Sequence, residues 1–345
     1  MEKVDLASWA EPVESFLTPL TAVAGSFTAL TGVVVDARTV LFLRAELAGL
    51  RRPGRTSANG TCHLLRAADG WTAVNLARPD DLAALPALLG SLGATGPASL
   101  DGLRAAARRV PAADVAAAAQ LLHIPAAAHG SARGSGPPAT AERHGTPSVR
   151  PPAEPRVVDF SAMWAGPLCA RLLGLAGARV TKVESTARPD GARSGSPAFY
   201  RWLHDGHESR VVDFSSPGAL AGLVEQADVV IEASRPRALR RLGLHAERFL
   251  AERPGRVWVS ITGYGRDDDR VAFGDDAAVA GGLTGRAPDG SPVFLGDAIA
   301  DPVTGVFAAE AAARSLAGGG GELVPVSMSA CAATLAASAA PAAPC

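Results

Sequence analysis

The fold of this 345-residue chain is decided by Val157-Val-Asp-Phe-Ser-Ala-Met-Trp-Ala-Gly-Pro-Leu-Cys169, which continues to Gly177-Ala-Arg-Val-Thr-Lys-Val-Glu184. Two apolar runs flank a turn and a helix opened by Gly-Pro, and this pattern predicts a βαβ unit. Proline suits the first helical turn because its missing N–H would have no partner there. The other free N–H groups attract anions, so Ala165 and Gly166 are candidate contacts for a phosphate. A purely structural turn is the alternative, because most such junctions bind no ligand.

The second half of the chain repeats this alternation. We expect strands at about 156–160, 178–184, 208–214, 228–232 and 257–262, separated by helical stretches. Strands that alternate with helices form parallel sheets. Residues 156–330 are therefore predicted to form an α/β domain, with a Rossmann-like, mainly parallel sheet and helices on both faces.

The first part of the chain predicts a small α+β domain over residues 1–129. Two apolar runs meet at an Asp69-Gly70 turn, and helices are expected at about 79–92, 100–108 and 111–122. Residues 130–155 are rich in glycine and proline and are predicted to be a domain linker. Residues 331–345 form a low-complexity tail, which is expected to be a frayed helix or disordered.

Composition excludes several classes of function. The formal net charge is −1, which provides no basic field for nucleic acid or an anionic membrane. The four cysteines have neither metal-ligand spacing nor a disulfide framework, so we expect no metal and a reducing, cytoplasmic location. The start of the chain has no signal-peptide pattern, and no apolar run suits membrane insertion.

Seven motifs, the first two of them from the stretch quoted above, occur in a characteristic order between residue 156 and about residue 330. They are Ser161-Ala-Met-Trp-Ala-Gly-Pro167, Gly177-Ala-Arg-Val-Thr-Lys-Val-Glu184, Ala227-Asp-Val-Val-Ile-Glu232, Ser234-Arg-Pro-Arg-Ala-Leu-Arg-Arg-Leu-Gly-Leu244, Val259-Ser-Ile-Thr-Gly-Tyr-Gly265, Gly274-Asp-Asp276 and Asp297-Ala-Ile-Ala-Asp-Pro-Val-Thr-Gly305. Together they resemble the large domain of the class III CoA-transferases, which include formyl-CoA and carnitine CoA-transferases and α-methylacyl-CoA racemase.

The resemblance implies chemistry on an acyl thioester, with coenzyme A bound as part of the substrate. It also implies an interlocked homodimer, or a heterodimer with a partner protein, whose active site lies between the domains of different chains. Ala67-Ala-Asp-Gly-Trp-Thr-Ala-Val74 resembles the family's small-domain strand pair, which normally follows the large domain. The chain is thus interpreted as a rearranged member in which the small domain comes first.

Asp276 is the first candidate for catalysis. The resemblance places it where family members carry the aspartate that forms an acyl anhydride or moves an α-proton. A desolvated, positioned carboxylate can attack a thioester carbonyl. The alternative is that Asp275 or Asp276 only caps a helix near 277–283. Asp275 is a further catalytic candidate, because two adjacent carboxylates either raise each other's pKa or diverge in direction, and His245 is the candidate partner base for racemisation.

Candidate contacts for the CoA phosphates are basic residues near strand ends. Arg235 follows a buried strand and is the strongest of them, beside Lys182, Arg193 and Arg210. Lys182 and Arg210 have alternative roles as solvated or sheet-edge residues. The segment 204–210, His-Asp-Gly-His-Glu-Ser-Arg, replaces a family pattern in which a lysine helps to hold these phosphates, and neutral histidine is a weaker phosphate ligand.

Several functions are therefore open at this point. The leading one is CoA transfer between carboxylic acids through an aspartyl anhydride, followed by α-proton racemisation. A member repurposed for specialised metabolism could instead use Asp276 in hydrolysis, substitution or elimination on a substrate without CoA. The third possibility is a non-catalytic subunit of a heteromer.

Overall fold

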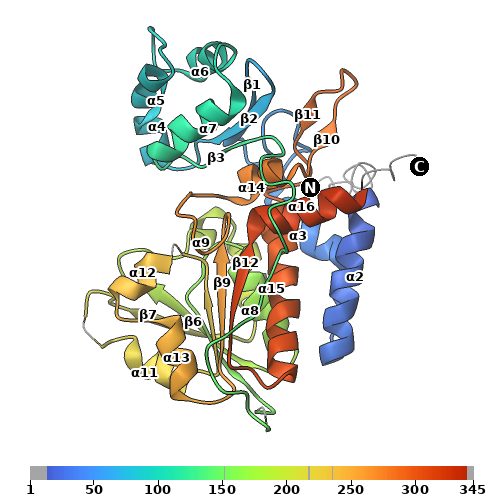
Figure 1. Cartoon of the computed structure of the whole chain (residues 1–345), viewed down its shortest axis with the longest axis vertical. Coiled ribbons are helices and arrows are strands. Elements are labelled where there is room, and N and C mark those ends of the chain that lie inside the picture. Colours follow the sequence, from blue (N-terminus) through green and yellow to red (C-terminus); the bar gives the residue numbers. More distant parts are fainter. Residues whose placement is uncertain (1–13, 151, 217, 235, 340–345) are drawn as a thin grey trace.

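The computed structural model describes residues 14–150, 152–216, 218–234 and 236–339 (Figure 1). The chain forms a large body around a seven-stranded sheet and a smaller body around a three-stranded sheet. Among the described residues, no helix is long and apolar enough to cross a membrane.

The large sheet has the strand order of a doubly wound fold. From one edge to the other it contains β4 (Glu142–Arg143), β12 (Glu322–Ser327), β9 (Val257–Thr262), β8 (Val229–Glu232), β5 (Arg156–Asp159), β6 (Arg179–Ser185) and β7 (Glu208–Val212). All neighbouring pairs are parallel except β4 with β12. The chain winds outward from β5 to β7 and then restarts beside β5 with β8. The crevice between the carboxyl ends of β5 and β8 is thus the topological switch point, where such folds bind ligands.

Helices cover both faces of this sheet. One face packs on α8 (Ala165–Leu175), α15 (Ala300–Ala317), α10 (Pro197–Leu203), α2 (Glu14–Thr31) and α3 (Ala37–Ala48). The other packs on α11 (Ala221–Gln226), α12 (Pro236–Arg241) and α13 (Ala246–Glu252). The predicted α/β fold, with a mainly parallel sheet between two layers of helices, is confirmed.

The smaller body is called here the small module and comprises residues 62–128. It contains β1 (Cys62–Arg66), β2 (Trp71–Asn75), α4 (Pro79–Ala83), α5 (Leu85–Ser91), α6 (Leu100–Ala107), α7 (Ala112–Leu121) and β3 (Ala126–Ala128). β1 and β2 are antiparallel, and Arg66 pairs with Trp71 across the expected turn. The Asp69 carboxylate in that turn accepts a hydrogen bond from the Ala112 N–H at 2.8 Å and so caps α7.

Two elements join the bodies. α14 (Gly274–Gly281) follows the carboxyl end of β9 and packs on β2, β3 and α16 (Met328–Ala339). Figure 1 shows it at the top of the large sheet, directly beneath the small module. A short hairpin, β10 (Gly285–Arg286) with β11 (Pro292–Val293), projects beside it.

The N-terminal helices lie elsewhere than the sequence suggested. The prediction grouped residues 1–129 in one small domain, but α2 and α3 share the core of the large body, where Leu20, Phe27 and Phe42 are fully buried. Ser26 on α2 also donates a hydrogen bond to Glu310 on α15 at 2.7 Å. Both helices belong to the large body because their apolar faces complete the helical layer over α15. The boundary at residue 129 stays a prediction.

The segments predicted to be a linker and a tail are ordered where they are described. In the 130–155 segment, β4 pairs with β12, and the backbone of Gly145 and Ser148 donates hydrogen bonds to the 319–321 turn. Of the 331–345 tail, residues 331–339 form most of α16, with Cys331 and Leu335 buried. Backbone pairing in one segment and small-residue packing in the other compensate for the composition that favoured disorder.

Helices α8 and α15 approach very closely at Gly305. A Cβ added there would lie 2.8 Å from the Ala165 carbonyl oxygen and 2.9 Å from the Leu168 Cβ. We expect Gly305→Ala to destabilise the protein by about 1–3 kcal/mol, because overpacking forces helices apart. Denaturant unfolding monitored by circular dichroism measures this change.

Gly25, in the middle of α2, is the matched control. A Cβ there would meet no atom within 4 Å, so Gly25→Ala should stabilise the protein by about 0.5–1 kcal/mol through helix propensity alone. Equal stability of the Gly305→Ala variant and the unmodified protein would contradict the packing described here.

Candidate active site

The candidate site is built around the start of α14. The Phe273 N–H donates a hydrogen bond to Asp276 Oδ1 at 3.0 Å, so the carboxylate reaches back to cap the first turn of its own helix. The capping interpretation is therefore correct for one oxygen of Asp276. The Asn75 amide of β2 lies 3.5 Å from the same oxygen, at the limit of a hydrogen bond.

The second oxygen of Asp276 is different. Oδ2 is buried and has no hydrogen-bond partner among the described residues, and the residue as a whole is 0% exposed. Burial raises the pKa of Asp276 to about 7, although the hydrogen bonds from Phe273 and Asn75 oppose this shift. The carboxyl group thus has one oxygen fixed by the fold and one free, poorly solvated oxygen that titrates near neutral pH.

Three further aspartates surround the start of this helix. Asp275 Oδ1 accepts a hydrogen bond from the Ala298 N–H at 3.0 Å, and burial followed by the charge of Asp297 raises its pKa. Asp301, in the first turn of α15, is half-buried. Burial raises its pKa to about 7, and the Arg44 charge and the nearby backbone of Gly274 and Ala165 oppose this shift. The cluster has its lowest free energy when some of its carboxylates are protonated, because several of them lie close together in a space with little water.

Arg44 is the cation that faces this cluster. Its guanidinium, on α3, forms an ion pair with Asp297 and lies 5.5 Å from the centre of the Trp164 ring. Its charge also lowers the pKa of Asp297 and of Asp301 against the effect of burial. α3 thereby contributes directly to the electrostatics of the site.

Sequence inspection missed the residues that the small module contributes. Asn75 and Cys62 come from β2 and β1, about 200 positions away in the chain, and only the tertiary structure brings them to α14. Burial and then the charges of Asp275 and Asp276 raise the pKa of the Cys62 thiol. Tyr264 also lies close to Asp276, since burial and then the Asp276 charge raise its pKa. In the sequence, the Gly-Tyr-Gly motif at 263–265 was the feature that could have pointed to this residue.

His245 is not part of this group. It is exposed at the start of α13, which packs on β9 and β12, whereas α14 packs on α16 and the small module. Figure 1 shows α13 low on the large body and α14 at its top. Glu247, in the first turn of α13, accepts a hydrogen bond at 2.7 Å from Arg266 in the loop that leads to α14, and the pairing of His245 with Asp276 stays a prediction.

The predicted phosphate cradle at Ala165 and Gly166 is occupied by the protein itself. Both residues are buried, Asp301 lies beside the Ala165 backbone, and a Cβ on Gly166 would collide with the Ser161 side chain. Because the switch-point crevice is filled by side chains of this chain, a phosphate bound there would have to displace Asp301.

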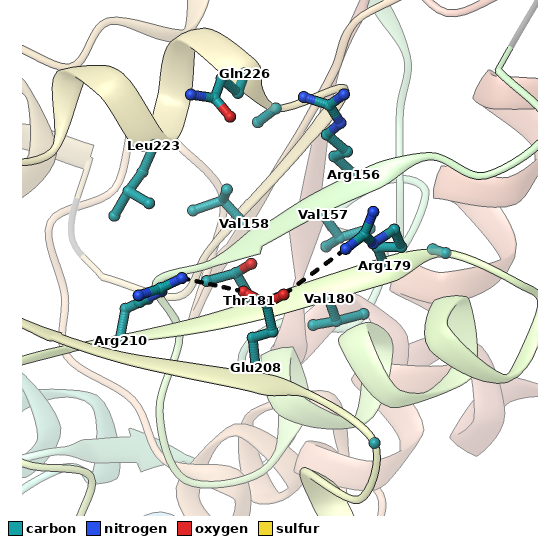
Figure 2. Close-up of a pocket in the computed structure, with 13 residues that line it drawn as sticks. Arg156, Val157, Val158, Arg179, Val180, Thr181, Glu208, Arg210, Leu223 and Gln226 are labelled. Carbon is teal, nitrogen blue, oxygen red and sulfur yellow. Dashed lines mark ion pairs between the residues drawn. The ribbon is translucent and has the colours of Figure 1, made fainter.

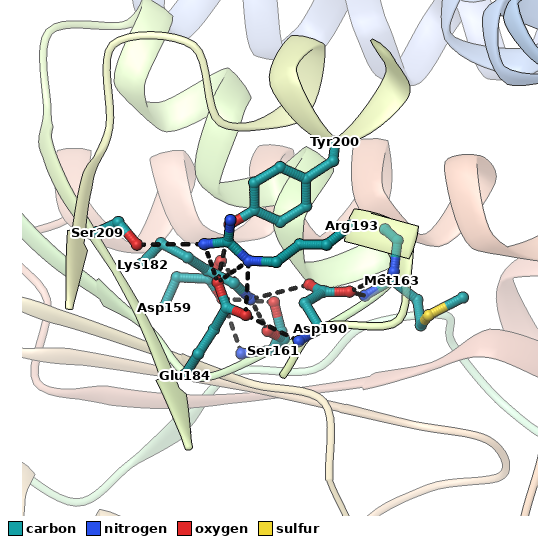
Figure 3. Close-up of polar contacts among 10 residues, drawn as sticks. Asp159, Ser161, Met163, Lys182, Glu184, Asp190, Arg193, Tyr200 and Ser209 are labelled. Atoms are coloured by element: carbon teal, nitrogen blue, oxygen red, sulfur yellow. Dashed lines mark hydrogen bonds and ion pairs between the residues drawn. The ribbon is translucent and has the colours of Figure 1, made fainter. Parts of the chain in front are cut away.

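Lys182 is the second correction to the predicted phosphate contacts. Its side chain is 1% exposed and lies 3.2 Å from Asp190 and 3.8 Å from Asp159, and it also donates to the Ser161 carbonyl (Figure 3). A buried ammonium that already has two carboxylates serves the fold rather than a solvent-borne anion. Asp190 in turn accepts hydrogen bonds from the Met163 N–H, which holds that residue at φ 71° beside the switch point.

Arg193 is half-exposed at the edge of the same network. Its guanidinium donates to both oxygens of Glu184 at 2.8–3.1 Å and stacks 4.2 Å from the Tyr200 ring centre. Burial works to raise the pKa of Glu184, but the hydrogen bonds from Arg193, the Asp190 backbone and Tyr200 lower it to about 2. Arg193 is thus oriented toward a cavity of about 340 Å³ that it shares with Arg201, His204 and His207.

The two histidines of this cavity are neutral at physiological pH. Burial and then the Lys182 charge lower the pKa of His204 to about 3, and burial followed by the Arg171 charge lowers that of His207 to about 4. Both ring nitrogens of His204 are buried and lack hydrogen-bond partners among the described residues. The cavity therefore presents two guanidinium groups and two neutral imidazoles.

Arg210 does not line this cavity. It lines an adjoining one, beside Glu208, which lines both cavities (Figure 2). Arg235 lies outside the described residues, so its predicted role stays a prediction. The described part of the chain also holds no group of three or more His, Cys, Asp or Glu residues that could bind a metal ion.

Comparison with known proteins gives a consistent pattern over the second half of the chain. The model of CoA-transferase family III matches residues 153–343. The chain is 31% identical over 192 residues to a succinate–glutarate CoA-transferase of Agrobacterium fabrum, covering 49% of this chain and 48% of that protein. It is 29% identical over 168 residues to a formyl-CoA:oxalate CoA-transferase of Bradyrhizobium sp., covering 45% and 40%.

A solved structure shows the same similarity in three dimensions. The crystal structure of a hypothetical protein from Mycobacterium tuberculosis matches with a TM-score of 0.50 and 29% identity, over 56% of this chain and 57% of that one. The chain spans about half the length of the curated relatives that it matches.

The raised pKa of Asp276 predicts a pH-dependent stability difference. Its folded-state pKa of about 7 lies above the ordinary 3.8, so the stability that its protonated form provides is lost as pH rises from about 4 through about 7. Asp276→Asn keeps an acceptor for the Phe273 N–H but cannot ionise. We expect the variant to be as stable as the unmodified protein near pH 4 and more stable by about 4 kcal/mol above pH 7.

Denaturant titrations of both proteins across this pH range measure the difference directly. Comparison with the variant cancels the opposite contributions of His204 and His207, whose lowered pKa values favour the folded state as pH rises. A stability difference that stays constant between pH 4 and pH 8 would show that Asp276 is not buried as described.

Proposed function

Because the chain belongs to CoA-transferase family III, we propose that it performs acyl-CoA chemistry at Asp276, with transfer of CoA between two carboxylic acids as the reaction. The observation that supports this function is that the two oxygens of the Asp276 carboxylate have different environments. Oδ1 is held by the Phe273 N–H, and Oδ2 is buried without a partner. A nucleophile needs both properties, a fixed position and an oxygen that is not stabilised by solvent.

The reaction starts with attack of Asp276 Oδ2 on the thioester carbonyl carbon. The new C–O bond forms, the C–S bond breaks, and sulfur leaves with the electron pair as the CoA thiolate. The acceptor carboxylate then attacks the Asp276 carbonyl carbon and releases the donor acid, which leaves an anhydride between Asp276 and the acceptor. Finally the thiolate attacks the acceptor acyl carbon, and Asp276 is restored as a carboxylate.

Asn75 is proposed as a positioning residue in this reaction. Its amide donates to Oδ1 and so lowers the pKa of Asp276 and orients the carboxyl group. It belongs to β2, which packs on α14 and helps to cover a carboxyl group that is 0% exposed. A thioester therefore reaches Asp276 only when the small module moves away from α14, and Asn75 couples this movement to the nucleophile.

The cavity that contains Arg193 is the proposed place for the CoA phosphates. Arg193 and Arg201 supply guanidinium groups, which bind phosphate through paired N–H donors. His204 and His207 are neutral and provide no positive charge, so phosphate affinity there depends on the two arginines. Ala165, Gly166 and Lys182 are not included, because the structure gives them other partners.

A second candidate function follows from the burial of Asp276. A carboxylate that no substrate can reach is also consistent with a non-catalytic subunit of a heteromer. One relative is named as the β subunit of a succinyl-CoA–L-malate CoA-transferase. Racemisation and chemistry on a substrate without CoA gain no specific support, since no contact joins His245 to Asp276 in the described part of the chain.

Replacement of Asp276 tests the catalytic proposal. Asp276→Asn should lower CoA transfer from succinyl-CoA to glutarate, the acids named for the relatives, on the order of 10³-fold or more, because the amide cannot form the anhydride. Trapping with hydroxylamine should place a hydroxamate on Asp276 of the unmodified protein, as measured by peptide mass spectrometry. Asp275→Asn is the matched control and should not remove this adduct.

Full activity of the Asp276→Asn variant would exclude the anhydride mechanism. Complete inactivity of the unmodified protein with every acyl-CoA tested, together with a co-purifying partner chain, would favour the subunit function.

The pH profile provides a further test of Asn75. Attack requires the ionised carboxyl group, so the rate should rise with pH through about 7. Asn75→Ala removes a donor that lowers this pKa, so its profile should shift to higher pH while the protein stays folded. An unchanged profile in this variant would mean that Asn75 only packs against α14.

The oligomeric state is the last point that we propose. Family resemblance implies a dimer, with itself or with a partner, although the wall over Asp276 comes here from the small module of the same chain. Light scattering after size exclusion should therefore give about twice the 35.0 kDa chain mass, or more with a partner. A stable and active monomer would show that one chain closes its own site, and the interlocked arrangement would have to be dropped.

A further inference from the structure

A cavity of about 570 Å³ lies at the amino edge of the large sheet and adjoins the Arg193 cavity, with which it shares Gly206 and Glu208. It is formed by the first residues of β5, β6 and β7 and by α11 (Figure 2). α14 and Asp276 follow the carboxyl edge of the same parallel sheet, so the two sites are separated by the length of the strands. The chemistry proposed at Asp276 therefore does not explain this cavity.

Three arginines gather on one face of the sheet around it. Arg156 and Arg179 are register partners on β5 and β6, and Arg210 lies on β7, next to Val183 of β6. Because side chains alternate along a strand, these residues share the α11 face with Val158 and Val183, whereas Val157 and Val180 face α8. Arg156 and Arg179 thus extend from directly opposite positions on neighbouring strands. Repulsion between their like charges costs free energy when no anion lies between them.

The negative charge available in the cavity is too small to balance them. Glu208 is the only acidic residue among the lining residues, and its two oxygens lie 3.9 Å from Arg179 and 3.6 Å from Arg210. Both distances exceed that of a hydrogen bond, so most N–H donors of these guanidinium groups have no acceptor. In the described part of the chain, the Arg156 guanidinium has no hydrogen bond or ion pair, and nearby Asp228 is paired with Arg253 at 2.7 Å.

We propose that this cavity is a second ligand site, which binds a small polyanion of the phosphate or carboxylate class. Arg156 and Arg179 would hold one anionic group, and Arg210 would hold another after displacing Glu208. Guanidinium groups suit both phosphates and carboxylates, because each presents parallel N–H donors to two oxygens. The volume is that of a small-molecule site, and Val158 and Leu223 provide an apolar surface for the carbon body of the ligand.

Calorimetric titration with inorganic pyrophosphate and, separately, with citrate tests the site and distinguishes the two sources of negative charge. The unmodified protein should bind at least one of them, more tightly at low salt than at high salt. The double variant Arg156→Gln/Arg179→Gln should bind that probe at least about tenfold more weakly, as expected for a lost charge-assisted hydrogen bond. Arg109→Gln removes an exposed arginine of the small module and is the control, with unchanged affinity expected.

Glu208→Gln separates this proposal from a simple effect on folding. The variant removes the internal competitor for Arg179 and Arg210, so it should bind the same probe severalfold more tightly. Failure of both probes to bind at about 10 mM would overturn the proposal, as would equal affinity in the double variant or weaker binding by Glu208→Gln. None of these outcomes depends on Asp276 or on acyl transfer.

Discussion

The half-buried carboxylate of Asp301 is the group on which the site depends. It lies where three helices begin, beside the backbone of Ala165 on α8 and Gly274 on α14 and in the first turn of α15. A helix start carries a partial positive charge and unpaired N–H groups, so one acidic group serves all three ends. If it were absent, these helix starts would lose the negative charge beside them, and α14 would lose its connection to the sheet. The position of Asp276 follows from this connection, because it lies in the first turn of α14.

The same arrangement explains why the predicted anion site at Ala165 is not free. A doubly wound fold offers helix N-termini at its switch point, and here the chain supplies the anion itself. Carboxylates consequently gather at the carboxyl edge of the sheet, with Arg44 facing them and Lys182 paired close by. Guanidinium groups with few acceptors gather at the opposite edge, around Arg156. The net charge of the whole chain is near zero and so gives no sign that acidic and basic groups are separated in this way.

The position of the small module gives the chain its unusual character. It precedes the large body in sequence, yet β2 and β3 lie on α14, and Asn75 reaches the nucleophile candidate. The ordered segment along β12 makes this possible, since its backbone pairs with the edge of the large sheet on the way to β5. A covering element from the same chain keeps Asp276 away from water, which raises its pKa.

The sequence by itself determined the parallel sheet and the strand pair around Asp69, and it pointed to Asp276 as the first candidate for catalysis, which stays a prediction. These features depend on local signals, namely apolar periodicity, turn residues and a motif with a fixed place beside a helix start. The sequence could not determine that α2 and α3 join the large core, that Lys182 is neutralised by Asp159 and Asp190, or that Asn75 meets Asp276. Only the tertiary structure decided these points, because burial and charge pairing depend on which distant segments share a space. The free energy of a buried charge is set by its partners, and those partners come from elsewhere in the chain.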